Sequence, residues 1–250
     1  MERRPIIQVR NLVAGYGDAV ILDRVSFSIY EGEIFVILGG SGCGKSTLLK
    51  NLIGLMPPLA GDIIIDGVSI STCGQDAFMR TLKKIGVLFQ GGALLGSMTL
   101  AENIALPVRE YTDLPGSAID SLVRMKLGLV NLGGYETYLP SEISGGMKKR
   151  AGLARAMALN PRILFFDEPS AGLDPVSSAE LDNLIIHLNR SLGTTMVIVT
   201  HELPSIFAVA QRVIMLDKAS KSIIAEGDPA YLRDSSQNRF VKQFFNREAG

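Results

Sequence analysis

A chain of 250 residues is long enough for one large α/β domain, and a fold of this size can bury about 70 to 75% of its unfolded surface without disulfides. The 25 lysines and arginines balance 25 aspartates and glutamates, which disfavours binding to nucleic acid or an anionic membrane through a basic surface. The two cysteines indicate a reducing compartment, the expected one being the cytosol, and we expect neither a targeting signal nor an apolar stretch approaching the ~20 residues of a membrane helix.

The N-terminal third predicts strands that lead into a strand, loop and helix. Residues 6–38 alternate apolar and polar side chains and end in a continuous apolar strand at 34–38. After the loop 39–44, residues 45–56 carry leucines at helical spacing and are stopped by two prolines. A hairpin is expected at 61–70, because an Asp-Gly turn separates two apolar runs.

The middle of the chain changes to a helical pattern. Residues 91–155 predict a helical lobe inserted into the sheet domain, with turn breaks at Pro107 and Pro115. The helix expected at 117–127 has an amphipathic stripe. Its members are Ile119, Leu122, Val123 and Lys126.

Sheet character returns in the last third. Apolar strands at 163–166 and 195–199 are separated by a helix at 177–190. Such alternation implies parallel strands joined by crossover helices. We expect a further hairpin within 213–225 and then a polar tail at 228–250.

A glycine-rich run joins the buried strand to the first helix and fits the phosphate-binding pattern of a glycine, four residues, then Gly-Lys-Ser. Glycines let successive N–H groups face the α- and β-phosphates, and Lys45 reaches the β/γ oxygens, so it is also a predicted catalytic residue. Ser46 is the expected Mg²⁺ ligand. An accidental glycine-rich turn is disfavoured by the flanking strand and helix. The predicted nucleotide-binding residues here are Gly39, Gly40, Ser41, Gly42, Cys43, Gly44, Lys45, Ser46 and Thr47.

Two acidic residues follow the apolar strand at 163–166, as in a Walker B element. Asp167 is expected to hold Mg²⁺, and Glu168 to accept a proton from the water that attacks the γ-phosphate. The alternative is an acidic pair that only caps the turn at Pro169. A phosphate-binding loop needs such a partner, which favours the catalytic interpretation.

Between these motifs, Ser144, Gly145, Gly146 and Met147 open a helix that Ser144 can cap, leaving open N–H groups for an anion. An ordinary capped helix is the alternative for this motif alone. With the other motifs the chain resembles the ATP-binding-cassette ATPases, whose signature typically reads Leu-Ser-Gly-Gly-Gln. Ile143 replaces the leucine conservatively, and Met147 replaces the glutamine, removing an amide that could bond to nucleotide.

The resemblance implies an α/β fold of the P-loop NTPase type, with a RecA-like core, an antiparallel β subdomain and an inserted helical subdomain. One ABC ATPase domain would cover 1–227. Within it, 1–90 and 156–227 would form the core and the β subdomain, and 91–155 the helical signature subdomain. A C-terminal tail would follow at 228–250.

Further site residues follow from the resemblance. Tyr16, between glycines, matches the aromatic that stacks on adenine, although a surface aromatic is the alternative. Gln90 matches the glutamine that touches Mg²⁺ and water and links the ATP site to the helical lobe. His201 matches the histidine that contacts the γ-phosphate and orients the water with Glu168. Asp174 belongs to a segment that communicates across the dimer.

The family's signature faces the phosphate-binding loop of a second subunit, so the resemblance implies a head-to-tail dimer of two copies with two ATP molecules between them. Arg150 and Arg155 on the signature helix are either readers of phosphate charge or, as is more common, ordinary solvated arginines.

The segment after Gln90 is similar to ATPases of the Mla type, which move phospholipid between the membranes of diderm bacteria with MCE-domain proteins. Gly91 to Leu95 and Met147 carry this resemblance. It implies permease subunits, an MCE-domain protein, and a place at the cytoplasmic face of the bacterial inner membrane. Another cargo is the alternative. A soluble ABC ATPase acting on nucleic acid or ribosomes would need a coiled-coil insertion or a second cassette, and neither pattern occurs. A switch without turnover would lack Glu168 or His201.

Overall fold

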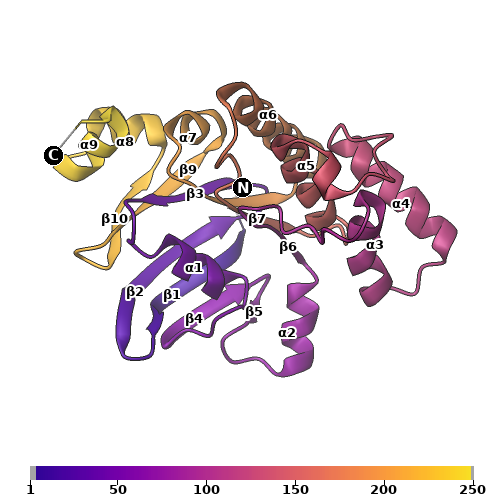
Figure 1. Ribbon diagram of the computed structural model, residues 1–250. Coiled ribbons are helices and arrows are strands. Elements are labelled where there is room, and N and C mark those ends of the chain that lie inside the picture. The colour runs from indigo at the N-terminus through magenta and orange to yellow at the C-terminus, as the bar shows by residue number, and fades with distance from the viewer. Residues whose placement is uncertain (1–3, 249–250) are drawn as a thin grey trace.

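The computed structural model describes residues 4–248, and its strands form two sheets (Figure 1). A four-stranded antiparallel sheet has the order β2-β1-β4-β5, and a six-stranded sheet has the order β10-β9-β3-β8-β7-β6. The strands are β1 (Pro5–Tyr16), β2 (Ala19–Tyr30), β3 (Ile34–Gly39), β4 (Ala60–Ile65), β5 (Val68–Ser69), β6 (Ile85–Leu88), β7 (Ile163–Asp167), β8 (Thr195–Val199), β9 (Arg212–Asp217) and β10 (Ser222–Gly227). Both predicted hairpins are confirmed, as β4-β5 and β9-β10.

The six-stranded sheet is built mainly from parallel pairs, as predicted. β3 pairs in parallel with β8 and β9, β7 pairs in parallel with β6 and β8, and the edge strand β10 is antiparallel. Every residue of β3 is buried, because both faces of the sheet are covered. Val36 and Leu38 join one apolar cluster, whereas Phe35 and Ile37 join the other.

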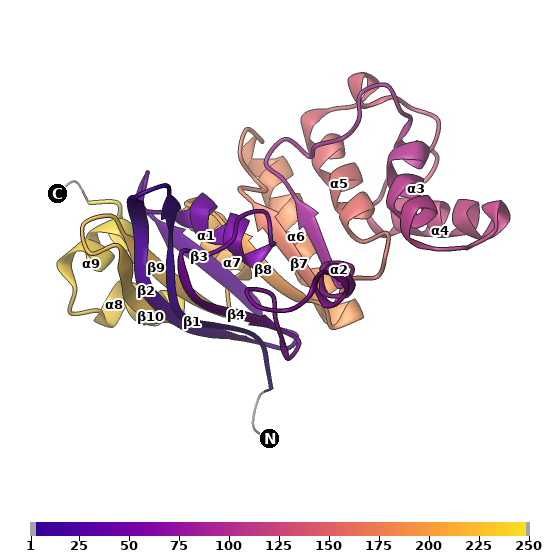
Figure 2. The same ribbon diagram turned by 90° about the horizontal axis from the view of Figure 1, so that it is seen from below.

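Helices lie on both faces of this sheet and at both ends of the molecule (Figures 1 and 2). They are α1 (Lys45–Leu52), α2 (Gln75–Leu82), α3 (Leu100–Tyr111), α4 (Gly116–Leu129), the short 3₁₀ turn η1 (Pro140–Glu142), α5 (Gly145–Ala156), α6 (Pro175–Leu192), α7 (Leu203–Val209), α8 (Pro229–Ser235) and α9 (Arg239–Asn246). The first helix shares an apolar cluster with the antiparallel sheet, whereas α3 to α6 contribute to the opposite cluster. None of the helices within residues 4–248 has the length and apolar character needed to cross a bilayer.

The helices α3, α4 and α5 lie together at one end of the molecule and contact one another (Figures 1 and 2). All three lie within the segment predicted to be a helical lobe. The stripe predicted on α4 is confirmed, since Ile119, Val123 and Lys126 are buried.

Pro107 does not break the chain as predicted, because it lies inside α3. A capping box at the start of this helix fixes its first turn: Thr99 Oγ accepts from the Glu102 N–H, and Glu102 accepts from the Thr99 N–H. Buried Ile104 and Val108 then hold the helix against the core on both sides of the proline. Packing therefore outweighs the loss of one backbone hydrogen bond. Pro115 is at a helix boundary as predicted, directly before α4.

The segment expected to be a polar tail is largely helical. Leu232 of α8, and Val241 and Phe245 of α9, are buried and belong to the main apolar cluster. Val241 and Phe245 are four residues apart, so they occupy one face of the helix. Both helices lie at the opposite end of the molecule from α3 to α5 (Figures 1 and 2).

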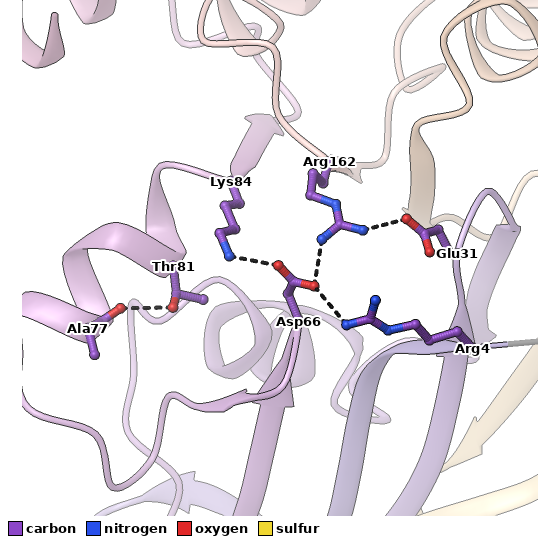
Figure 3. Close-up of polar contacts among 7 residues, drawn as sticks. All are labelled: Arg4, Glu31, Asp66, Ala77, Thr81, Lys84 and Arg162. Atoms are coloured by element: carbon purple, nitrogen blue, oxygen red, sulfur yellow. Dashed lines mark hydrogen bonds and ion pairs between the residues drawn. The ribbon is translucent and has the colours of Figure 1, made fainter.

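A charged cluster connects the antiparallel sheet to the central sheet (Figure 3). Asp66, in the turn between β4 and β5, accepts from Lys84 Nζ and from Arg162 Nη1 at 2.6 Å each. Arg162 also pairs with Glu31, and Arg4 lies 3.7 Å from the Asp66 carboxylate. Lys84 precedes β6 and Arg162 precedes β7, so one carboxylate fixes both strand starts to the β4-β5 turn.

Candidate active site

The glycine-rich loop runs from the end of β3 into α1, and its glycines are required sterically. Gly39, Gly42 and Gly44 have positive φ values of 149°, 74° and 104°. A Cβ atom on Gly39 would lie 2.4 Å from the carbonyl oxygen of Leu216, and one on Gly44 would lie 2.8 Å from a methyl group of Leu22. Any side chain at either position would distort the loop that leads its N–H groups to the helix N-terminus.

The side chains of this loop have different roles. Lys45 Nζ donates to the carbonyl oxygens of Gly39 (2.8 Å) and Gly40 (3.2 Å), so its ammonium lies over the loop that encircles the predicted phosphate site. Ser46 is in the first turn of α1, next to buried Thr47. Cys43 is buried, and burial raises the pKa of its thiol; its backbone N–H donates to the Gly40 carbonyl oxygen at 3.4 Å.

Asp167 and Glu168 stand at the carboxyl end of β7, as predicted. Burial raises the pKa of Asp167 and the neighbouring Glu168 charge raises it further, while Lys149, Lys50 and Lys45 act in the opposite direction. The carboxylate is thus partly desolvated and within range of the lysine of the phosphate-binding loop.

Glu168 is held in an unusual backbone conformation. Its φ is 45°, in the left-handed region that non-glycine residues rarely adopt, and its N–H donates to Val199 O at 2.8 Å. Its Oε1 lies 2.9 Å from His201 Nδ1. The other oxygen, Oε2, is buried and has no hydrogen-bond partner among the described residues.

Gln90 is exposed, two residues beyond the end of β6. Its carbonyl oxygen accepts from Lys149 Nζ, and the same ammonium donates to the Glu168 carbonyl oxygen at 3.4 Å. Lys149 is not among the predicted site residues. Lys149 lies four residues before the apolar Leu153, so both side chains lie on the inward face of α5. This spacing is the sequence pattern that could have predicted a buried lysine.

The signature segment forms the N-terminus of α5. Ser144 caps it as predicted, since its Oγ accepts from the Met147 N–H at 3.3 Å. Met147 packs against the main apolar cluster, so its side chain serves the core. Arg150 pairs with Glu180. The interpretation of Arg155 as a solvated side chain is wrong: it donates to Ala93 O (2.6 Å) and Gly92 O (3.1 Å), because neither carbonyl has a strand or helix partner nearby.

Two further predicted residues lie at the surface. Tyr16 ends β1 and is 51% exposed; its hydroxyl accepts from Lys50 Nζ at 3.3 Å. Asp174 caps α6 by accepting from the N–H groups of Val176 and Ser177. The signature helix α5 is well separated from α1 in both views (Figures 1 and 2). The fold therefore brings Lys45, Asp167, Glu168 and His201 into one region, while the signature helix α5 lies apart from α1.

A phosphate-binding loop between a parallel strand and a helix, an acidic pair after a second strand and a serine-capped helix with open glycines together define an ATP-binding-cassette ATPase. The chain belongs to the ABC transporter family, whose model matches residues 22–171.

Similarity to individual proteins extends over almost the whole chain. It is 45% identical over 240 residues to the probable ribonucleotide transport ATP-binding protein mkl of Mycobacterium tuberculosis, covering 96% of this chain and 66% of mkl. It is 40% identical over 244 residues to the intermembrane phospholipid transport system ATP-binding protein MlaF of Haemophilus influenzae, covering 98% of this chain and 91% of MlaF. The dimeric post-hydrolysis structure of the ATP-binding cassette MJ0796, bound to ADP and Pi, matches with a TM-score of 0.79 and 29% identity, covering 89% of this chain and 98% of that one.

Proposed function

We propose that this chain is the ATP-hydrolysing subunit of a transporter that moves phospholipid between the inner and outer membranes of a bacterium. Two copies bind head to tail around two ATP molecules and drive a membrane permease that works with an MCE-domain protein. The permease holds the chain at the cytoplasmic face of the inner membrane. Similarity to MlaF along nearly the full length of both chains supports this cargo.

The two carboxylate oxygens of Glu168 carry the proposal for hydrolysis. Oε1 is held by His201, and Oε2 is buried without a partner in the described chain. A buried oxygen without a hydrogen bond is unfavourable, and it is the acceptor that an attacking water requires. As the water oxygen bonds to the γ-phosphorus, its proton passes to Oε2. The bond from the γ-phosphorus to the bridging oxygen breaks, which leaves ADP and phosphate.

The residues predicted to bind Mg²⁺ suit that ion. The Ser46 hydroxyl, the Gln90 amide oxygen and one Asp167 carboxylate are hard oxygen donors, and they leave coordination positions for phosphate and water. No cluster of three His, Cys, Asp or Glu residues occurs within residues 4–248. Asp167 is already desolvated and near Lys45, where a further cation favours its ionised form. When bound, Mg²⁺ neutralises charge that develops on the β/γ oxygens.

In the proposed dimer, the signature segment of each copy completes the ATP site of the other. The helix α5, which begins at Gly145, lies apart from α1, the helix that follows the phosphate-binding loop of the same chain (Figure 2). In the proposed arrangement the open glycine N–H groups after Ser144 face the γ-phosphate bound by the second copy, and Asp174 lies at the seam between the copies. The dimeric MJ0796 structure with ADP and Pi supports this arrangement.

A groove of about 640 Å³, lined by α2, β6, α3 and the end of α5, supports a permease contact. Its wall includes the large apolar side chains of Met79, Leu106 and Tyr111, which are exposed. Arg155 also lines the groove while holding the carbonyls of the loop after Gln90. A permease segment seated here would contact the arginine that fixes this loop. The change Leu106→Asp should reduce co-purification with the permease, and unchanged co-purification would exclude this groove.

The proposed phospholipid cargo can be tested against ribonucleotide as the alternative cargo. The mkl relative is described as a probable ribonucleotide transporter subunit, but this chain spans only 66% of it, against 91% of MlaF. The complex with its permease and MCE-domain protein is reconstituted in vesicles carrying a fluorescent phospholipid. We expect ATP-dependent transfer of this lipid to the MCE-domain protein. ATP-dependent uptake of labelled ribonucleotide, without lipid transfer, would contradict the phospholipid assignment.

A further inference from the structure

Lys149 is a buried cation for which the hydrolysis scheme above has no role. It lies on α5, five residues beyond Ser144, and only 6% of its surface is exposed. Its ammonium donates to the carbonyl oxygens of Gln90 and Glu168. These carbonyls follow the ends of β6 and β7, which are adjacent parallel strands. One side chain of the signature helix thus contacts the backbone just beyond the ends of both strands.

We propose that Lys149 is a positioning residue for ATP hydrolysis. By binding the carbonyl groups of Gln90 and Glu168 together, it sets the direction of the Glu168 carboxylate and makes that direction depend on the position of α5. The inference rests on the hydrolysis proposed for this site.

Glu168 needs such support because its backbone is strained. Its φ of 45° is unfavourable for a residue with a side chain, and it persists only where neighbouring groups hold it. The N–H is fixed by Val199 O on β8, and the carbonyl oxygen accepts from the Ala171 N–H at 3.1 Å and from Lys149 Nζ at 3.4 Å. The bond from Ala171 is local to the turn, whereas the bond from Lys149 is the one that ties this carbonyl to α5. If the lysine contact is lost, the peptide after Glu168 keeps one hydrogen bond instead of two, and the direction of the carboxylate no longer depends on the position of α5.

Burial of an ammonium requires a compensating interaction. Lys126 of α4 is also buried, at 3% exposure, but its Nζ donates to the Asn160 side chain at 2.6 Å. Lys149 instead lies near the charges of Asp167 and Glu168, which stabilise its ammonium. The two lysines are therefore similar in burial and different in their partners, which makes Lys126 a matched control.

Arg155 is a second tether on the same helix. It holds Gly92 and Ala93, so α5 binds the loop after β6 at two points, through Lys149 and Arg155. A displacement of α5 would therefore move this loop with it. Among these two cations, Lys149 is the one that also reaches Glu168.

The test compares Lys149→Met, Lys149→Arg and Lys126→Met in the full chain bound to its permease. The ATP dissociation constant, kcat and melting temperature are measured for each. We expect Lys149→Met to lower kcat about 10- to 100-fold, because small misplacements of a catalytic group cost this much. The ATP dissociation constant should stay within about twofold. Lys149→Arg should recover most of kcat, and Lys126→Met should change the melting temperature but not kcat.

A kcat near the wild-type value in Lys149→Met would overturn the proposal, as would an equal loss in Lys126→Met. Should Lys149→Met fail to fold, Lys149→Leu serves as the second variant under the same criteria. Absence of turnover in the wild-type complex would contradict the proposed function itself, and this inference with it. The two failures are therefore distinguishable.

Discussion

His201 Nδ1 lies 2.9 Å from Glu168 Oε1, across 33 residues of sequence. An ionised carboxylate only accepts hydrogen bonds, so the ring holds Glu168 when Nδ1 carries the proton. This contact occupies one carboxylate oxygen and leaves Oε2 for the water. In the proposed mechanism, the histidine therefore orients the base.

The first prediction concerns this base. Glu168→Gln removes the proton acceptor but keeps the size of the side chain, so kcat should fall by about 10²- to 10⁴-fold. ATP should still bind, and the closed dimer should accumulate, because the nucleotide between the two copies is not hydrolysed. Phosphate release and size-exclusion chromatography with ATP measure these effects. Turnover at the wild-type rate would remove Glu168 as the base.

The second prediction concerns the phosphate-binding loop. Lys45→Ala removes the ammonium that lies over the loop, and the ATP dissociation constant should rise about 10- to 100-fold, as expected for a hydrogen-bonded charge. Exposed Lys242 on α9 provides a control for charge removal, and Lys242→Ala should bind ATP as wild type does. Equal affinity in the two variants, measured by titration calorimetry, would contradict the assignment of Lys45.

The third prediction separates the ring of Tyr16 from its hydroxyl. Tyr16→Ala should weaken ATP binding about 5- to 100-fold through loss of stacking on adenine, with kcat at saturating ATP retained. Tyr16→Phe loses the hydrogen bond from Lys50 but keeps the ring, so its affinity should remain close to wild type. If the alanine variant binds ATP with unchanged affinity, the ring does not stack on the base.

The fourth prediction concerns stability and pH. Asp66→Asn should lower the free energy of unfolding by about 1–3 kcal/mol, because Lys84 and Arg162 lose their shared carboxylate (Figure 3). Asparagine tolerates the positive φ of this turn, so the backbone should not change. Chemical denaturation measures the loss, with Asp113→Asn at an exposed position as the control.

The pH dependence follows from the same contacts. The hydrogen bond from Lys84, and then that from Arg162, lowers the pKa of Asp66 in the folded state. Its contribution to stability is therefore complete above the unfolded pKa of about 3.9 and is lost as pH falls through the lower folded value. The difference between wild type and Asp66→Asn should shrink in acid. A difference that stays constant from pH 7 to strong acid would show that the carboxylate charge is not responsible.

Much of the fold and site could be predicted from local patterns. The glycine-rich loop, the strand that ends in Asp167 and the cap at Ser144 each depend on a few consecutive residues. Predictions failed where packing outweighs local preference. Pro107 stays inside α3 because the apolar residues around it are buried, and α9 is helical because Val241 and Phe245 reach the core. The helix α2 was also missed.

The sequence by itself determined the chemistry of the nucleotide site, since loop geometry, capping and the acidic strand end are set within one or two turns of chain. Only the tertiary structure decided which buried groups meet. Lys149 reaches Gln90 across 59 residues and Arg155 reaches Ala93 across 62, and no local pattern encodes either contact. A buried cation binds the carbonyl groups that lie close to it once the helical lobe has packed against the sheets. That packing depends on the whole core, so no short stretch of sequence determines it.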